Sequence, residues 1–108
     1  MEWQPLAKEL HQASKRLNEG ADGIFKMARE KAEKERDYRI ALMKEIVTLK
    51  DQGERATLIP DIARGKCADQ KFERDLSEAR YTAAREALES VRCQVSAIQT
   101  ILKFHSDI

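Results

Sequence analysis

The stretch ATLIPDIARGKC, residues 56–67, is the one part of this chain that does not have the pattern of a charged helix. It contains Leu58, Ile59 and Ile62, with a proline inside the stretch and a glycine behind these residues. An apolar run of this kind between two long charged segments indicates a short connecting segment, residues 56–65. We expect its three apolar side chains to cover the open end of a helical hairpin.

The ends of that connecting segment carry their own signals. Gly53 is a candidate C-cap for a preceding helix, because glycine easily takes the left-handed conformation that ends helices. Thr57 is a candidate N-cap for a short helical piece that Gly65 would end, and Pro60 disfavours helix at Ile59.

The last part of the chain has the clearest helical pattern, and it predicts a helix over residues 66–105. One apolar stripe runs along it with every step three or four residues. The mean step is about 3.8 residues, which favours a straight or right-handed course over a left-handed coiled coil. The stripe comprises Ala68, Phe72, Leu76, Ala79, Ala83, Ala87, Val91, Val95, Ile98 and Leu102.

The first part of the chain predicts a long helix over residues 5–51. Pro5 suits its first turn, where the missing N–H is harmless. Gly20 and Gly23 each disfavour helix by about 1 kcal/mol relative to alanine. A kink or a break near residue 20 is therefore left open. The early stripe is Leu6, Leu10, Ala13, Leu17, Ala21, Ile24 and Ala28.

Length and composition predict one helical domain over residues 1–108. The chain has 108 residues, 36% of them charged, with four Gly and two Pro. This mixture is typical of an all-α hairpin or coiled coil with two long antiparallel helices. The formal charge of +1 gives no global field to attract nucleic acid or an anionic membrane. No apolar run approaches the roughly 20 residues that span a bilayer, so we expect no membrane contact and a cytoplasmic location.

A lone hairpin would leave part of the apolar face of the last helix exposed to solvent. Burying a large aliphatic side chain is worth about 1.5 to 3 kcal/mol. We therefore expect association into a dimer or a larger helix bundle, with the number of copies and the helix orientation between them left open. The candidate interface residues are Leu88, Val91, Val95, Ile98 and Leu102.

Catalytic chemistry finds little support in the sequence. Cys67 and Cys93 are too far apart on one helix to bond to each other, and they fit free thiols or a disulfide between chains. His11 and His105 stand at opposite ends, so no metal-ligand spacing exists. We expect a protein that is not an enzyme and that has no metal and no cofactor.

The basic residues suggest two kinds of anion binding. Arg64, Gly65 and Lys66 precede the last helix, where backbone N–H groups and two cations could hold a phosphate or nucleotide. The arginines of both long helices have acidic neighbours that would repel a phosphate backbone. A nucleotide is thus a candidate ligand, and direct binding of nucleic acid is disfavoured.

Three segments resemble a family of short helical proteins from phages and prophages of Gram-positive bacteria. They are IFKMAREKAEKERDYRIAL (24–42), ATLIPDIARG (56–65) and YTAAREALESVRCQVSAIQTILKF (81–104). The chain departs from that family at NEGADG (18–23), where similar chains are more plainly helical. The resemblance implies an early-gene context near recombination genes, in the host bacterial cytoplasm, and implies no site residues.

These observations leave three functional hypotheses. The first is a non-enzymatic phage accessory protein that binds a host or phage protein partner in phage DNA replication or recombination. The second is an anti-defence protein that inhibits a host immune effector or sequesters an anionic nucleotide signal. The third is a direct DNA-binding protein.

Overall fold

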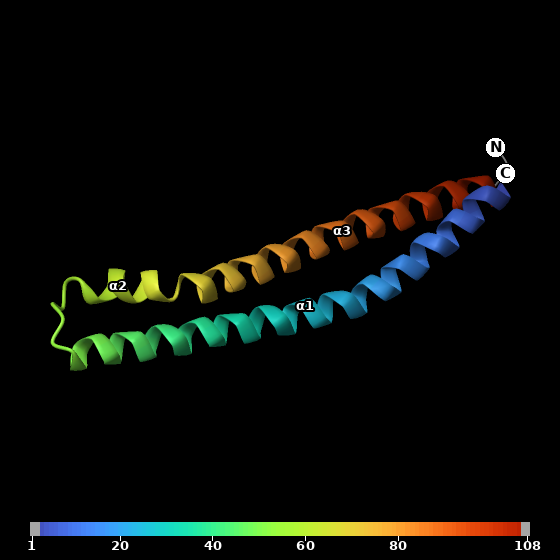
Figure 1. The fold of residues 1–108 in the computed structure, drawn as a ribbon. Helices are drawn as coiled ribbons and strands as arrows, with labels where there is room; N and C mark the ends of the chain where they lie inside the picture. Colours follow the sequence, from blue (N-terminus) through green and yellow to red (C-terminus); the bar gives the residue numbers. More distant parts are fainter. Residues whose placement is uncertain (1–2, 107–108) are drawn as a thin grey trace. The chain divides into compact units, whose positions relative to one another are not determined.

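A computed structural model describes residues 3–106 and shows three helices in that range (Figure 1). Two are long, α1 (Trp3–Asp51) and α3 (Ala68–Ser106), and α2 (Ile59–Lys66) lies between them in the chain. No strand occurs within these residues. The predicted all-α chain of two long helices joined by a short helical segment is confirmed.

The chain packs as two compact units, each built from both long helices. Unit 1 comprises residues 3–26 of α1 and 82–106 of α3 among the described residues. Unit 2 comprises residues 27–81, which hold the rest of α1, all of α2 and the start of α3. The sequence predicts one domain, and the division into units falls inside continuous helices rather than in a linker.

The turn after α1 ends that helix in the way the sequence predicts. Gly53 has a positive φ of 76°, the left-handed region that favours glycine. Its N–H donates to the Lys50 carbonyl at 3.0 Å, and the Glu54 N–H donates to the Leu49 carbonyl at 3.1 Å. These two bonds form a Schellman motif, which satisfies carbonyls that the helix end would otherwise leave unpaired.

The start of α2 differs from the prediction. Its N-cap is Leu58, with no side-chain capping bond, so the prediction of Thr57 as the cap is wrong. Pro60 lies in the first turn of α2, where a missing N–H breaks no helical bond. Helix at Ile59 is therefore compatible with the proline that follows it.

An apolar cluster closes the turn end of unit 2, where α2 lies beside the end of α1 (Figure 1). Ile59 and Ala63 of α2 are buried against Leu49 of α1. Ile62 is partly buried in the same cluster, whereas Leu58 remains 44% exposed. Two of the three residues predicted to cover this end thus face the cluster, together with Leu42 and Ile46.

The covered face of α3 repeats every 3.5 residues, so the predicted mean step of about 3.8 is wrong. Eight steps of three or four residues join nine of the eleven buried or half-buried positions from Arg74 to Leu102, and the other two, Leu76 and Gln94, lie beside this line. This is the heptad spacing of coiled coils. Polar residues take several of these positions, whereas four alanines and one phenylalanine of the predicted stripe are exposed. The covered positions are Arg74, Ser77, Tyr81, Ala84, Leu88, Val91, Val95, Ile98 and Leu102, and the exposed residues are Ala68, Phe72, Ala79, Ala83 and Ala87.

In unit 1, α1 runs without a break through Gly20 and Gly23. Gly20 is half-buried in the covered face, whereas Ala21 of the predicted stripe is exposed. A Cβ added at Gly20 would lie 2.6 Å from Cδ1 of Leu88. The glycine therefore makes room for a leucine of the opposite helix, and the question of a break near residue 20 is answered by a continuous helix.

Candidate functional site

Unit 2 contains a buried polar contact that the sequence did not predict. The guanidinium carbon of Arg74 lies 4.6 Å from the ring centroid of Tyr38, which is 7% exposed. The Arg74 side chain itself is 24% exposed. At this distance an arginine is attracted by the ring face, an interaction worth about 0.5 to 2 kcal/mol depending on burial. A polar side chain thus occupies a position where a coiled coil usually has an aliphatic one.

A second contact of the same kind lies in the same unit. Lys31 Nζ lies 5.1 Å from the ring centroid of Tyr81. Each long helix therefore supplies one cation and, seven residues later, one tyrosine, and each cation covers the tyrosine of the opposite helix. Two pairs with a spacing of two turns fix the antiparallel register, because a shift of one turn would break both.

The sequence contains a weak signal of this arrangement. Three residues of the first half recur 43 positions later in the second half, and a fourth position pairs a lysine with an arginine. Taken alone, such matches in an Ala, Glu and Arg rich chain carry little information. The structure gives them a reason, because an antiparallel hairpin brings the two copies face to face. The pairs are Lys31/Arg74, Glu35/Glu78, Tyr38/Tyr81 and Ala41/Ala84.

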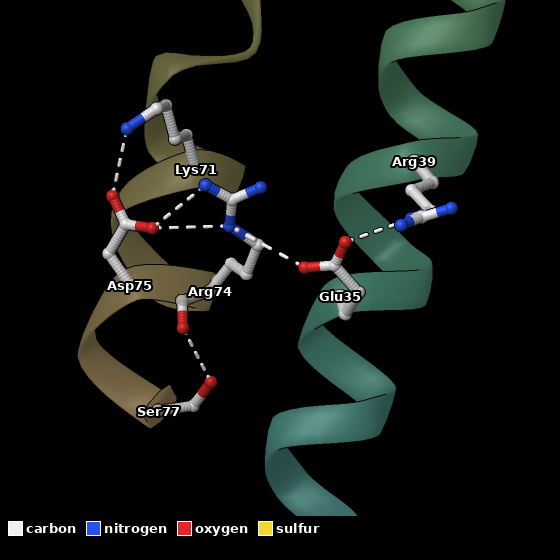
Figure 2. A network of polar contacts seen from close by, with 6 residues as sticks. All are labelled: Glu35, Arg39, Lys71, Arg74, Asp75 and Ser77. Atoms are coloured by element: carbon white, nitrogen blue, oxygen red, sulfur yellow. Dashed lines mark hydrogen bonds and ion pairs between the residues drawn. The ribbon is translucent and has the colours of Figure 1, made fainter. Parts of the chain in front are cut away.

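Ion pairs surround Arg74 and cross between the helices (Figure 2). Arg74 Nη2 lies 3.0 Å from Asp75 Oδ1, and its Nε lies 3.5 Å from Glu35 Oε2. Glu35 also accepts from Arg39 Nε at 2.8 Å, and Asp75 accepts from Lys71 Nζ at 2.9 Å. The result is a chain of five charged side chains in which each carboxylate lies between two cations.

The charges in this network shift the pKa values of Asp75 and Arg74. The pKa of the Asp75 carboxyl is lowered because Lys71 and then Arg74 donate hydrogen bonds to its charged form. The pKa of the Arg74 guanidinium is raised, chiefly by its hydrogen bond to Asp75. Arg74 therefore stays a cation and Asp75 stays a carboxylate at neutral pH.

Two buried polar side chains complete the covered face of unit 2. Ser77 is 3% exposed and donates its hydroxyl to the Arg74 carbonyl at 2.8 Å. Cys67, between α2 and α3, is 2% exposed. Burial raises the pKa of the Cys67 thiol, and the negative charge of Glu45 raises it further. A thiol in this setting is held protonated and away from solvent, whereas the Cys93 thiol is exposed.

The three residues of the candidate anion site lie at the end of one helix rather than at the start of the next. Arg64, Gly65 and Lys66 occupy the last turn of α2, and α3 begins only at Ala68. A helix C-terminus presents carbonyl groups, which repel anions. Arg64 Nη1 lies 3.1 Å from Asp61, and Lys66 Nζ lies 3.8 Å from Glu45. The helix N-terminus that the anion hypothesis needs is therefore absent at these residues.

The five candidate interface residues lie on the covered face of unit 1. Ile98 is 4% exposed within a single chain, so the expectation that a lone hairpin leaves it exposed to solvent is wrong. Leu88, Val91, Val95 and Leu102 are half-buried. At Leu88 that apolar surface lies against Gly20 of α1.

The large apolar side chains that do remain exposed lie on another surface. Ile40, Met43 and Val47 of α1 are 47%, 60% and 50% exposed. Their spacing of three and four residues places them in one line on the helix. At about 100° per residue, Ile40 lies roughly 200° around the helix axis from the buried Tyr38. We call these three residues the outer strip, since they face away from the covered side of α1.

Unit 1 has an open apolar hollow near both helix ends. It has a volume of about 620 Å³ and is lined by residues of α1 and α3, among them Trp3, Leu10 and Leu102. Trp3 is 51% exposed, and Phe104 does not belong to the lining and is 71% exposed. The remaining lining residues are Ala7, Gln99, Lys103 and His105.

Comparisons with protein-family models, with curated proteins and with solved structures found no match to this chain. Over the residues that the structure describes, no helix is both long enough and apolar enough to cross a membrane.

Proposed function

We propose that this protein is a non-enzymatic accessory protein that binds a protein partner through the outer strip of α1. The proposal is supported above all by the exposure of Ile40, Met43 and Val47 in one line. Single exposed apolar residues are common on protein surfaces, but an ordered row of large ones is typical of a docking helix.

The packing of the two long helices in unit 2 supports the same proposal. Tyr38, which lies next to the outer strip in sequence, is fixed on the opposite side of α1 by Arg74. Leu49 and Ile59 pack together at the turn end, so the part of α1 that carries the outer strip is held in place. A surface held in place before binding loses less conformational entropy when a partner docks.

The resemblance to phage proteins suggests where the partner belongs. We propose a host or phage protein of DNA replication or recombination, met in the host cytoplasm. Inhibition of a host immune effector is the alternative, and it would use the same kind of contact. The nucleotide version of that alternative has less support, because Arg64 and Lys66 are paired with carboxylates at a helix C-terminus.

Self-association is part of the proposal at a different surface. Since Ile98 is already buried within one chain, a dimer would form through an exposed residue such as Phe25, which is 76% exposed. Mass measurement by light scattering over a range of concentrations tests this. A constant monomer mass would reject self-association and leave binding through the outer strip untouched.

The central experiment is affinity purification from host cells during phage infection with cross-linking. The test variant replaces Ile40, Met43 and Val47 together with Gln, a good helix former that removes the apolar surface. The matched control replaces Phe72 with Gln, an exposed apolar residue outside the outer strip. We expect the control to retain the cross-linked partner and the test variant to lose it. Retention by a folded test variant would reject the proposed function.

A further inference from the structure

The charges around the outer strip indicate what kind of partner it fits. Within one helical turn of the strip at each end, residues 36–51, the exposed charged side chains are four cations and two carboxylates. Glu45 also falls in this range, but it is half-buried on the other side of α1 and pairs with Lys66. The exposed set is Arg36, Arg39, Lys44, Lys50, Asp37 and Asp51.

The cations lie on both flanks of the apolar line. Counted at about 100° per residue, Lys44 lies on one side of the line through Ile40 and Val47, and Lys50 lies on the other. Arg36 and Arg39 use part of their charge on Asp37 and Glu35, at 3.2 Å and 2.8 Å. Within residues 3–106, Lys44 and Lys50 form no ion pair. Two uncommitted cations therefore border the apolar surface.

We propose that the outer strip binds an amphipathic helix whose apolar face is bordered by Asp or Glu side chains. This inference rests on the proposed function and names the partner's chemistry. Apolar contact with Ile40, Met43 and Val47 supplies the attraction, while carboxylates opposite Lys44 and Lys50 select the partner and speed its approach.

The same charges argue against the two other occupants of an apolar helix face. A second copy docking on the same strip would bring two positively charged flanks together, which is unfavourable. An anionic membrane would attract the lysines. However, a row of three half-exposed side chains is a small apolar face for an interfacial helix, and Asp37 and Asp51 lie on the same surface.

The test uses the full chain and two synthetic helical peptides with the same leucine face. One peptide has glutamate on both flanks of that face, and the other has lysine at the same positions. Binding is measured by fluorescence anisotropy at low and moderate salt. We expect the glutamate peptide to bind at least about tenfold more tightly, with the preference reduced by salt. Equal binding of both peptides, or binding of neither, would overturn the inference.

Charge reversal locates the effect. The variant Lys44→Glu with Lys50→Glu is expected to lose the preference for the glutamate peptide and to bind the lysine peptide better. The matched control, Lys8→Glu with Lys26→Glu, makes the same change in net charge at exposed positions of unit 1 and should keep the preference. A preference lost equally in both variants would show a general charge effect and overturn the assignment to the outer strip.

The remaining outcomes separate this inference from the proposed function. If infected-cell capture requires Ile40, Met43 and Val47 but is unchanged by reversal of Lys44 and Lys50, binding through the strip holds and the acidic partner is rejected. Binding to phosphatidylserine vesicles without binding to the glutamate peptide would overturn the inference in favour of a membrane. A concentration-dependent mass that the Gln variant of the strip abolishes would overturn it in favour of a second copy.

Discussion

The two units of this hairpin use the same heptad positions for different chemistry. In unit 1 the covered face of α3 is aliphatic, with Leu88 and Ile98 facing α1 and Gly20 making room for one of them. In unit 2 the equivalent positions hold Arg74, Ser77 and Tyr81. Aliphatic burial is worth more per residue, while polar pairs tolerate fewer alternative registers. The covered face of α3 is therefore expected to supply stability in unit 1 and register in unit 2, where apolar burial comes from the cluster of Leu49, Ile59 and Ala63.

The largest effect should come from the aliphatic face. We expect Ile98→Ala to lower the free energy of unfolding by about 2 to 4 kcal/mol, because it leaves a cavity among packed side chains. The control Ile101→Ala, at a residue 39% exposed, should change it by less than about 1 kcal/mol. Urea unfolding followed by circular dichroism measures both. Similar small losses for the two variants would mean that α1 does not enclose Ile98 in solution.

Running the same measurement at two protein concentrations sharpens that comparison. If the loss caused by Ile98→Ala shrinks on dilution, copies of the chain contribute to covering Ile98, because association adds less to stability at low concentration. A loss independent of concentration supports burial within one chain, as the structure has it.

The glycines of unit 1 give a second, smaller contrast. Gly23 has open space around the position of a Cβ, so Gly23→Ala should stabilise the helix by about 0.5 to 1 kcal/mol. Gly20→Ala gains the same helix propensity, but Leu88 must move, and overpacking of this kind costs about 1 to 3 kcal/mol. We therefore expect Gly20→Ala to be less stable than Gly23→Ala in thermal unfolding.

A double variant identifies the cause of the difference between these glycines. When Leu88→Ala is already present, Gly20→Ala should stabilise the chain about as much as Gly23→Ala does. If Gly20→Ala remains unfavourable in that background, the close approach to Leu88 is not the reason.

In unit 2 the expected loss at Arg74 is smaller. Arg74→Ala removes the ring contact with Tyr38 and the pairing with Glu35, and we expect it to lower the free energy of unfolding by about 1 to 2 kcal/mol. Arg80 is a suitable control, since its guanidinium lies 4.0 Å from Glu30 at an exposed site and its removal should change stability by less than about 0.5 kcal/mol. Equal losses of unfolding free energy for the two arginine variants would contradict a special role for Arg74 between the helices.

The smallest effect concerns the two thiols. Because the pKa of Cys67 is raised on folding, this group stabilises the fold below the unfolded thiol pKa of about 8.5, and that contribution is lost as the pH rises through the folded value. Stability should therefore fall at alkaline pH less steeply in Cys67→Ala than in the unaltered chain. Cys93→Ala is the control and should follow the unaltered chain, since its thiol is exposed.

Reaction with a thiol reagent provides an independent check of the same contrast. Cys93 should react at once in the folded protein, and Cys67 only as the protein unfolds. Prompt reaction of both thiols would contradict the burial of Cys67.

The sequence predicted the helices well because their signals are local. Gly53 ends α1 through its own backbone preference, and the composition favours helix along the rest of the chain. The predicted stripe of α3 failed because it was built from apolar residues alone. Ala79 and Ala83 belong to that stripe but are exposed. Arg74 and Ser77 occupy the covered face, and their hydrophobicity does not indicate this.

The candidate sites were predicted less well for a related reason. The sequence places Arg64 and Lys66 before the last helix, but it shows neither that α3 begins only at Ala68 nor that Lys66 pairs with Glu45 of α1. Ile98 was judged exposed because the sequence does not show how much of one helix the other covers. The outer strip was overlooked because Ile40, Met43 and Val47 stand beside the inner residues Leu42 and Ile46 in the chain.

By itself the sequence determined that this chain forms two long helices with a short apolar helix between them, because helix propensity and glycine geometry act over a few residues. Only the tertiary structure decided which side of each helix is covered, since that depends on the antiparallel register of residues up to 85 positions apart, as in the bond between Glu9 and Gln94. That choice of register buries Ile98, places Arg74 over Tyr38 and leaves the outer strip facing outward.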